Sequence, residues 1–378
     1  MRLLKLDSIH PLDYLLHKQQ EWKPDIADLT RKAYYDRIIA LRCNFSDFYT
    51  YNLNRLGWQS EEFFINDWMY VYKLAKELYG STYKFKRLVH QLRNRAGLIE
   101  PEWRLKVLKD YIDAYKPDVI FCREHTNIPG SFWKQYRKKI FLVSRLSAHL
   151  PAEWSPLDFD LIYTDVPYYR TFFEFNKIET LHNYNGFDER ILNELTKNKE
   201  PYDVVFIGGL GNELFQQRTR FFTDLAADDQ FGFKWWGYST GTIEQPLTDA
   251  YQGLAAGLAM FNIYYNSKIV VNDYIDIAGG TAVNQRLFEV MGAGSLLLTR
   301  ESPSLVEHFP PGSYVTYKNL EECKGKISYY LRNEDERKQI AALGQAAVLA
   351  KYSYAKLMQL ISEDLTTRVT KFKQLKKN

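Results

Sequence analysis

The chain has 378 residues, of which 46% are hydrophobic and 25% charged, so we expect two globular domains and exclude a disordered protein. The net charge of +4 is small for this length, which argues against a nucleic-acid binder with a strongly basic face. Cys43, Cys122 and Cys323 are scattered without metal-ligand spacing, which favours a reducing compartment. There is also no apolar run of about 18 residues and no signal-peptide pattern, so we expect a cytoplasmic protein.

Strands and helices alternate through the first half of the chain, which predicts a parallel, doubly wound sheet. The predicted strands cover residues 2–6, 37–41, 62–65, 119–122, 140–143, 161–164 and 178–181. Helices are expected over residues 45–56 and 68–115 and from residue 131 onward. Such sheets bind ligands beyond the carboxyl ends of their strands. The site candidates in this half are therefore the polar residues that follow two of these strands: Glu124, His125, Arg145 and His149.

A cluster of basic residues lies in the helical segment 68–115. Its members are Lys84, Lys86, Arg87, Arg93 and Arg95. One interpretation is a solvated helical face. The other is a surface that meets anionic lipid or an anionic glycan carrier, whose binding would weaken with salt. At most, the second interpretation predicts peripheral contact with the inner face of a membrane.

The pattern of strands and helices restarts after a charged, polar segment. We interpret residues 188–201 as a linker between an N-terminal domain (1–187) and a C-terminal domain (202–353). A helical tail (354–378) follows, and one expectation is that it packs back on the N-terminal domain. Strands are predicted over residues 203–207, 233–236, 269–271, 295–298 and 314–317, and helices over 214–227, near 254, before 295, and from 320 and 335. The predicted fold is α/β, with two Rossmann-like, doubly wound parallel-sheet domains facing a cleft that would hold the active site.

The segment 267–299 combines a strand, a loop ending in Gly-Gly-Thr, a helix and a second strand. Gly280 lets the backbone approach a ligand and Thr281 can cap the helix, so its free N–H groups and positive dipole end would suit a phosphate. Glu289, two turns further on, can accept hydrogen bonds from ribose hydroxyls. Alternatively, Arg286 and Glu289 form an i,i+3 ion pair on a solvated face and the glycines only interrupt the loop.

These motifs resemble the C-terminal half of GT-B glycosyltransferases. DVVFIGG is followed by an arginine on the next helix, then by IVVN, NQRLFEVMGAGSLLLT, SLVEHF and YVTY. The block N-x-R-x-F-E-x-x-x-x-G is similar to that of the CgeB-like group, named after a spore-maturation protein. It corresponds here to Asn284, Arg286, Phe288, Glu289 and Gly294. KPDVIFCREH, LIYTD and NYNGFDERIL in the first half resemble the N-terminal domain of these enzymes more loosely.

The resemblance implies a sugar-nucleotide donor held mainly by the second domain. Its diphosphate would lie near residues 281–284, with Arg286 and Arg218 as positive partners, and Glu289 would hold the ribose. The implied donor-binding residues are Gly208, Gly209, Arg218, Gly237, Tyr238, Asn272, Gly280, Thr281, Asn284, Arg286 and Glu289. Many retaining members carry a second glutamate eight positions before the one matching Glu289, where this chain has Thr281. The sequence therefore leaves retaining and inverting chemistry open.

The predicted activity is hexosyl transfer to a glycan, a glycolipid, a lipid-linked carrier or a small acceptor, with no cofactor and no metal. An inverting enzyme needs a base at the acceptor, for which the candidates in order are His125, Glu124 and His149. The D-x-D at residues 158–160 precedes its strand, so we interpret it as a strand-edge turn and not as a metal site. Two alternatives stay open, a GT-B-type sugar-nucleotide epimerase and a non-catalytic GT-B-like scaffold for glycan binding or assembly. No G-x-G-x-x-G follows the first strand, which disfavours an NAD-dependent oxidoreductase.

Overall fold

The computed structural model describes residues 1–43, 46–95, 102–146, 158–164, 167–182, 185–198, 201–212, 215–274 and 283–376. The chain forms two compact units. Unit 1 comprises Met1–Tyr184 and Met358–Asn378, and unit 2 comprises Asn185–Leu357. Residues 188–198, which we expected to be part of a linker, belong to unit 2 and contain the short 3₁₀ helix η5 (Glu189–Asn193).

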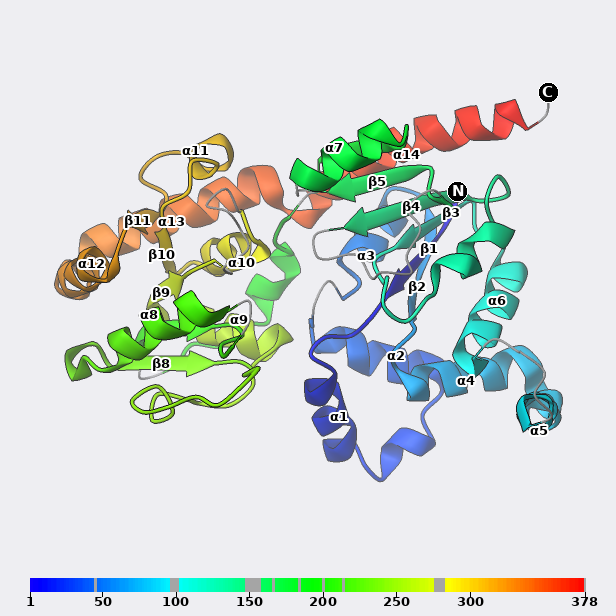
Figure 1. Cartoon of the computed structure of the whole chain (residues 1–378), viewed down its shortest axis with the longest axis horizontal. Coiled ribbons are helices and arrows are strands. Elements are labelled where there is room, and N and C mark those ends of the chain that lie inside the picture. Colours follow the sequence, from blue (N-terminus) through cyan, green and yellow to red (C-terminus); the bar gives the residue numbers. More distant parts are fainter. Residues whose placement is uncertain are drawn as a thin grey trace. The chain divides into compact units, whose positions relative to one another are not determined.

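Unit 1 is built on a six-stranded parallel sheet with the order β2-β1-β3-β4-β5-β6 (Figure 1). The strands are β1 (Arg2–Asp7), β2 (Gln59–Phe64), β3 (Val119–Cys122), β4 (Phe141–Leu146), β5 (Leu161–Thr164) and β6 (Glu179–His182). β1, β3, β4 and β5 are almost entirely buried, as expected for inner strands of a sheet covered on both faces. Every strand predicted in this half is therefore present, except the one over residues 37–41.

Residues 37–41 lie in and just after the helix α2 (Arg31–Ala40), so the prediction of a strand there was wrong. The Oγ1 of Thr30 caps this helix by accepting a hydrogen bond from the Ala33 N–H at 3.1 Å. Tyr34 and Ile38, one helical turn apart, are both buried. The short apolar run RIIAL is compatible with either structure by itself, and packing of the helical face decided between them.

The other helices of unit 1 flank this sheet. They are α1 (Leu12–Glu21), α3 (Phe48–Arg55), α4 (Trp68–Tyr79), α5 (Tyr83–Arg95), α6 (Trp103–Tyr115) and α7 (Pro167–Phe175), with the 3₁₀ helices η1 (Asp25–Ala27), η2 (Gly80–Thr82) and η3 (Gly130–Gln135). The C-terminal helix α14 (Tyr354–Leu375) adds its residues from Met358 onward to unit 1. There Trp58 Nε1 donates to Ser362 Oγ at 2.8 Å, and Lys373 pairs with Asp118 at 2.5 Å.

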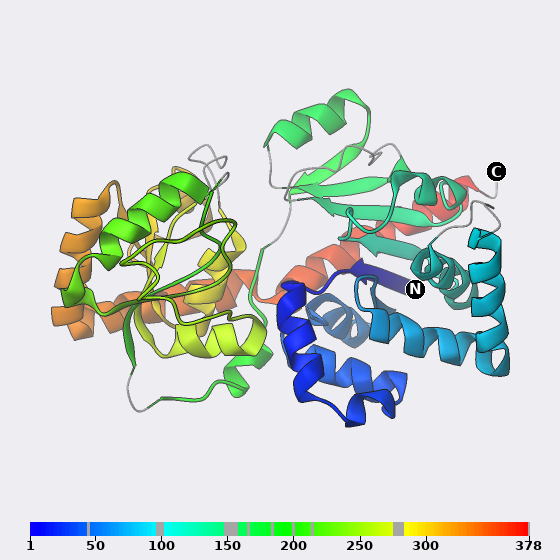
Figure 2. The same cartoon turned by 60° about the horizontal axis from the view of Figure 1, so that its bottom comes forward.

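Unit 2 contains a five-stranded parallel sheet with the order β11-β10-β9-β7-β8. Strands of this sheet are labelled in Figure 1, and Figure 2 shows the same unit turned by 60°. Its strands are β7 (Tyr202–Ile207), β8 (Phe233–Trp236), β9 (Ser267–Asn272), β10 (Leu296–Arg300) and β11 (Val315–Tyr317). Its helices are α8 (Gln216–Ala226), α9 (Gly257–Tyr265), α10 (Gln285–Ala293), α11 (Leu305–His308), α12 (Leu320–Arg332) and α13 (Glu334–Tyr352), with the 3₁₀ helix η7 (Asp229–Phe231). All five strands predicted in this half are present.

Both units are thus α/β domains with parallel sheets, which confirms the predicted fold class. In unit 2 the apolar faces of β7, β9 and β10 form a core with α8 and α12, in which Val204, Ile269 and Leu298 are fully buried. None of the helices in the described ranges is both long and apolar enough to span a membrane.

Candidate functional site

The carboxyl edge of the unit 2 sheet carries most of the predicted donor-binding residues. At the end of β9, the buried Asn272 donates through Nδ2 to Thr299 Oγ1 of β10 at 2.9 Å. Asn284, the residue before α10, donates through its own Nδ2 to Asn272 Oδ1 at 3.3 Å. Two asparagines of the predicted set therefore tie the start of α10 to the ends of two neighbouring strands. This is the edge at which parallel sheets bind ligands.

The start of α10 retains hydrogen-bonding capacity. Asn284 occupies the N-cap position but makes no side-chain capping bond. Among the described residues, Asn284 Oδ1 and Gln285 Oε1 are buried and accept no hydrogen bond. Buried polar atoms in native folds usually have a hydrogen-bond partner, so a buried acceptor without one needs an explanation, such as a role in binding a ligand. Gly280 and Thr281 lie outside the described residues, so the predicted cap by Thr281 stays a prediction.

Arg286 and Glu289 interact on the polar side of α10. Arg286 Nη1 lies 3.7 Å from Glu289 Oε2 and donates to Tyr264 Oη at 2.7 Å. The side chains are 28% and 13% exposed, so this i,i+3 pair is only partly accessible and not a fully solvated one. Burial raises the pKa of Glu289, although the charge of Arg286 opposes the shift. The opposite face of α10 is apolar, with Leu287, Val290 and Met291 buried.

The glycines after β7 and β8 let two loops approach each other. Gly237 has a φ of +149°, and a Cβ on it would lie 1.9 Å from the carbonyl oxygen of Gly208. A Cβ on Gly209 would lie 2.6 Å from the ring of Tyr238. The loops are joined by a hydrogen bond from the Leu210 N–H to the Tyr238 carbonyl at 3.0 Å. These predicted donor-binding residues thus have a structural reason for being glycine, and Tyr238 remains half exposed.

Arg218 of α8 points into the same edge and is buried. Its guanidinium donates to the Gly209 carbonyl and, at 3.4 Å, to the Asp273 carbonyl. It also lies 4.7 Å from the centroid of the Phe215 ring. Arg218 therefore holds the loop after β7 to the end of β9. Its predicted contact with the donor diphosphate stays a prediction.

Sequence reasoning missed a second ion pair at this edge. Asp273 is buried directly after β9 and accepts two hydrogen bonds from Arg300, at the end of β10, at 2.6 and 2.7 Å. Such a bidentate pair fixes both planar groups. The available signal was positional, because each charged residue closes an apolar strand of the same parallel sheet.

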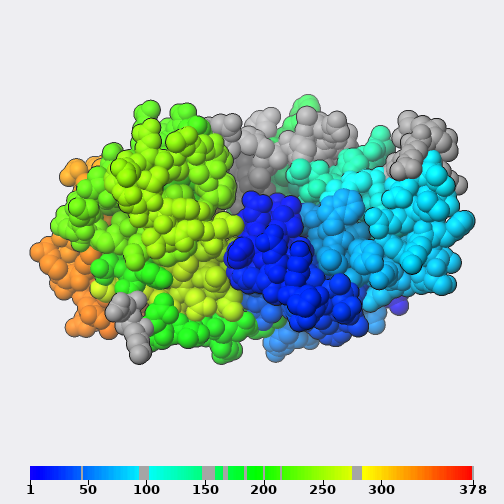
Figure 3. Space-filling model, turned by 90° about the horizontal axis from the view of Figure 1, so that it is seen from below, coloured from blue at the N-terminus to red at the C-terminus, as the bar shows by residue number. Residues whose placement is uncertain are grey.

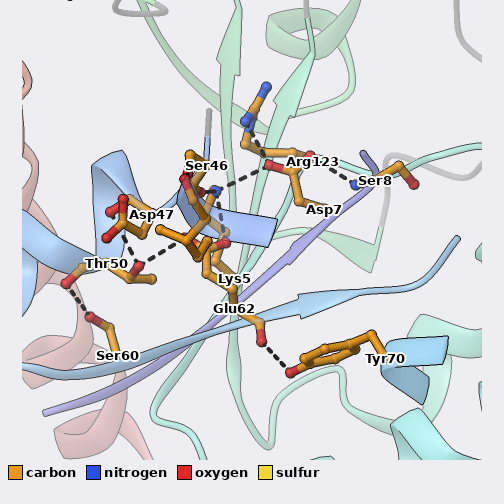
Figure 4. Close-up of polar contacts among 11 residues, drawn as sticks. Lys5, Asp7, Ser8, Ser46, Asp47, Thr50, Ser60, Glu62, Tyr70 and Arg123 are labelled. Carbon is orange, nitrogen blue, oxygen red and sulfur yellow. Dashed lines mark hydrogen bonds and ion pairs between the residues drawn. The ribbon is translucent and has the colours of Figure 1, made fainter. Parts of the chain in front are cut away.

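The carboxyl edge of the unit 1 sheet carries a buried charge network (Figure 4). The backbone register places Lys5 of β1 beside Glu62 of β2, and Lys5 Nζ lies 2.8 Å from Glu62 Oε2 and 3.1 Å from Asp7 Oδ2. Asp7 also pairs with Arg123 at 2.8 Å, while Glu62 Oε1 accepts a hydrogen bond from Thr50 at 2.8 Å. Sequence reasoning missed this network, although a lysine inside a buried strand signals a paired acid.

Burial acts differently on the two carboxyl groups of this network. It tends to raise the pKa of Asp7, but Arg123 and Lys5 outweigh it, so the pKa of Asp7 is lowered. Burial raises the pKa of Glu62 to about 7, although Lys5 opposes the shift. Asp7 is therefore the ionised partner that fixes Arg123 at the strand end, next to the predicted catalytic residues.

The predicted base candidates of unit 1 differ in the hydrogen bonds that their side chains make. Glu124 is buried, and its carboxylate accepts hydrogen bonds from the N–H groups of Thr126 and Asn127, at 2.5 and 2.8 Å, and from the Ser8 hydroxyl. It is thus committed to holding its own loop. His149 lies outside the described residues.

His125 fits a base better than Glu124 does. Its Nε2 lies 3.0 Å from the carbonyl oxygen of Arg145 and 3.2 Å from Ser144 Oγ. A carbonyl only accepts, so Nε2 carries the proton and Nδ1 is the basic nitrogen of the neutral ring. Burial lowers the pKa of His125, which keeps the ring neutral at pH 7. The structure thus orients His125 through the end of β4.

The D-x-D sequence lies at the opposite edge of the unit 1 sheet. Asp160 directly precedes β5, and its Oδ2 accepts a hydrogen bond from the Leu142 N–H at 2.8 Å. Asp158 is buried and lies 4.0 Å from Arg137. Both residues therefore have contacts at a strand start, which agrees with the predicted strand-edge turn.

Comparison with solved structures gives the class of this fold. A glycosyltransferase from Rickettsia africae aligns over 98% of both chains with 11% identity and a TM-score of 0.54. Anabaena HepE, solved with UDP-glucose, aligns over 97% of this chain and 100% of its own with 13% identity and a TM-score of 0.55. The UDP-GlcNAc 2-epimerase of Neisseria meningitidis aligns over 97% and 100% with 10% identity and a TM-score of 0.53. These similarities show the GT-B fold.

Comparison at the sequence level matches one part of the chain to a family. Residues 217–363 match the family described as glycosyl transferase-like. This stretch is less than half of the chain, runs from α8 into the first half of α14, and includes α10 and its ion pair. No curated protein sequence matches the chain. The solved structures confirm the predicted GT-B fold, and the family match over residues 217–363 agrees with the prediction of a glycosyltransferase. The assignment to the CgeB-like group stays a prediction.

Proposed function

We propose that this glycosyltransferase takes a sugar from a nucleotide-sugar donor held by unit 2 and transfers it, without a metal, to a glycan, a lipid-linked acceptor or a small acceptor. The observation that carries the proposal is the start of α10. There Asn284 and Gln285 have buried acceptor atoms without a hydrogen-bond partner among the described residues. They directly precede Arg286 and lie about one helical turn before Glu289, and the side chains of this ion pair are partly accessible. Acceptor atoms and a carboxylate suit the hydroxyls of a ribose, and a helix start suits the diphosphate.

In this proposal the residues of unit 2 stabilise the leaving group. Negative charge grows on the nucleoside diphosphate as the glycosidic bond breaks, and the N-terminal end of α10 and the guanidinium of Arg286 would offset it. Glu289 would accept hydrogen bonds from the ribose, so that Arg286 exchanges part of its ion pair for the phosphate. Tyr264 would keep Arg286 in place throughout, because it holds Nη1 at 2.7 Å. Arg218 would act by holding the loop after β7.

For an inverting reaction, His125 of unit 1 would take the proton of the acceptor hydroxyl. Its lowered pKa keeps it unprotonated, and the Arg145 carbonyl fixes the tautomer in which Nδ1 can accept a proton. Glu124 would serve as a positioning residue for this loop. His149 remains a further candidate from the sequence. The anomeric configuration of the product, compared with that of the donor, shows whether the reaction inverts or retains.

Thermal unfolding in the presence of nucleotides tests the donor site. HepE was solved with UDP and with UDP-glucose, so UDP and its sugars come first, followed by GDP and other nucleoside diphosphates. A ligand at about a hundred times its dissociation constant adds about 2.7 kcal/mol to the free energy of unfolding. A flat response to every nucleotide would contradict the proposal and favour the scaffold alternative.

A sugar-nucleotide epimerase is the second candidate, because two structures of such enzymes share the fold along nearly the whole chain. The two activities differ in their need for an acceptor. An epimerase converts the donor alone into an isomeric sugar nucleotide, whereas a transferase releases the nucleoside diphosphate in proportion to glycosylated acceptor. NMR of the donor incubated with and without acceptor separates them.

A further inference from the structure

The helix α5 exposes an apolar stripe on the side opposite to its packing face. Tyr83 and His90 are buried and pack against Trp103 of α6, with ring centroids 6.2 and 5.3 Å apart. With about 3.6 residues per turn, residues 85, 88 and 92 fall on the opposite face. Phe85 is 69% exposed, and Leu88 and Leu92 are 52% exposed. The core of unit 1 therefore does not explain these three side chains.

The same helix is strongly basic. Its sequence, YKFKRLVHQLRNR, contains five lysines and arginines and no acidic residue. Lys84 is exposed beside the apolar stripe, while Lys86 lies 4.2 Å from the centroid of the Tyr79 ring and Arg87 donates to Tyr83 Oη at 3.2 Å. These two long side chains thus lie along the flanks of the helix, between the packing face and the apolar stripe.

We propose that α5 binds the surface of a membrane that contains anionic lipids. A helix with apolar side chains on one face and cations along its flanks lies in the plane of the interface, with the apolar face among the acyl chains and the cations at the headgroups. Charge complementarity selects a lipid surface over a protein groove, because the described cations of α5, Lys84, Lys86 and Arg87, lie beside the stripe, the helix has no acidic residue, and anionic headgroups surround an inserted helix on all sides. Figure 3 shows the cyan segment of α4 and α5 at the surface of unit 1.

The length of the helix fits this role. Thirteen residues from Tyr83 to Arg95 give roughly 20 Å of helix, and the stripe from Phe85 to Leu92 spans two turns of it. Each inserted apolar side chain is expected to raise the partition coefficient about tenfold. Each cation near an anionic surface is expected to add about a further fivefold. The proposal does not depend on the chemistry of unit 2, and its test needs no turnover.

Sedimentation of the full chain with lipid vesicles tests the proposal. Wild type should bind vesicles of neutral lipid mixed with anionic phosphatidylglycerol, and bind weakly to neutral vesicles or in high salt. The triple variant Phe85→Ser, Leu88→Ser and Leu92→Ser should lose at least about a hundredfold in partition coefficient. Because these side chains are exposed, its thermal unfolding should match that of wild type. Phe175→Ser, which removes an 87% exposed side chain from α7, is the matched control and should bind like wild type.

Three outcomes would overturn the proposal. One is equal binding of the wild type and the triple variant to anionic vesicles. A second is no binding of the wild type to these vesicles, with retention on a soluble sulfated polysaccharide, which would assign the basic residues to an anionic glycan. A third is a dimer in light scattering that the triple variant abolishes without any vesicle binding, which would assign the stripe to a second copy of the chain.

Discussion

Replacement of Glu289 by alanine tests the donor site most directly. The carboxylate lies in α10, is 13% exposed and faces Arg286 at 3.7 Å, which is longer than a hydrogen-bonded ion pair. A hydrogen bond to a charged group contributes about 1.5–3 kcal/mol. Part of this gain is offset, because Glu289 gives up some of its attraction to Arg286 when the ribose binds. We therefore expect a net loss of about 1.5–2.7 kcal/mol, or ten- to a hundredfold in the dissociation constant of the nucleotide.

Isothermal titration calorimetry with the nucleotide found by the thermal screen measures this loss. Glu289→Gln keeps one acceptor oxygen and removes the charge, so its loss should lie between those of wild type and Glu289→Ala. The control is Glu336→Gln on α13, which removes the charge of an exposed carboxylate bonded to Tyr329. Because the distance between Arg286 and Glu289 is long and the pair is partly exposed, the free energy of unfolding of the Glu289 variants should differ from that of wild type by at most about 1 kcal/mol. An unchanged dissociation constant in Glu289→Ala would remove this residue from the site and leave only its ion-pair role.

Three further predictions concern catalysis and the two sheets. His125→Ala should lower kcat by about 10²–10⁴-fold and leave donor binding nearly unchanged. In wild type, kcat should fall only as the pH drops through the lowered pKa of this histidine. A kcat of His125→Ala equal to that of wild type would exclude His125 as the base. Gly237→Ala should destabilise unit 2 by about 3 kcal/mol in urea unfolding, because its Cβ would meet the Gly208 carbonyl at 1.9 Å. Gly325→Ala on α12, with open space around its Cβ, should stabilise slightly, and equal effects of the two would refute the reasoning. Burial raises the pKa of Glu62 from 4.5 to about 7. Between these pH values the folded state keeps a proton that the unfolded state has lost. The free energy of unfolding should therefore fall, by about 3 kcal/mol at most, as the pH rises through this range. Glu62→Gln should flatten this part of the pH profile, and an unchanged profile would contradict the raised pKa.

The sequence alone determined the fold class and the positions of all the predicted strands except the one over residues 37–41. Apolar runs such as those of β3, β7 and β9 are long enough, and bounded clearly enough by polar residues, to predict buried parallel strands. Some residues at or after strand ends were found for the same reason, because chain position fixes which edge of a parallel sheet they reach, although Asp273 after β9 was missed. This applies to His125 after β3 and to Asn272 at the end of β9.

Tertiary structure decided which side chains pair and which helical faces are covered. Residues 37–41 formed a helix because Tyr34 and Ile38 pack into unit 1, a contact that local periodicity does not contain. The pairing of Lys5 with Glu62 depends on the register between strands 57 residues apart in the sequence.

The faces of α5 and the contacts of Arg218 depended on tertiary structure as well. The sequence located the basic residues of α5, but only the packing of Tyr83 and His90 on Trp103 showed that Phe85 points outward. Likewise, the sequence placed Arg218 near a phosphate site, and only the fold showed that it donates to backbone carbonyls. Local patterns determine elements, whereas contacts between distant segments determine the chemistry that each side chain has left to offer.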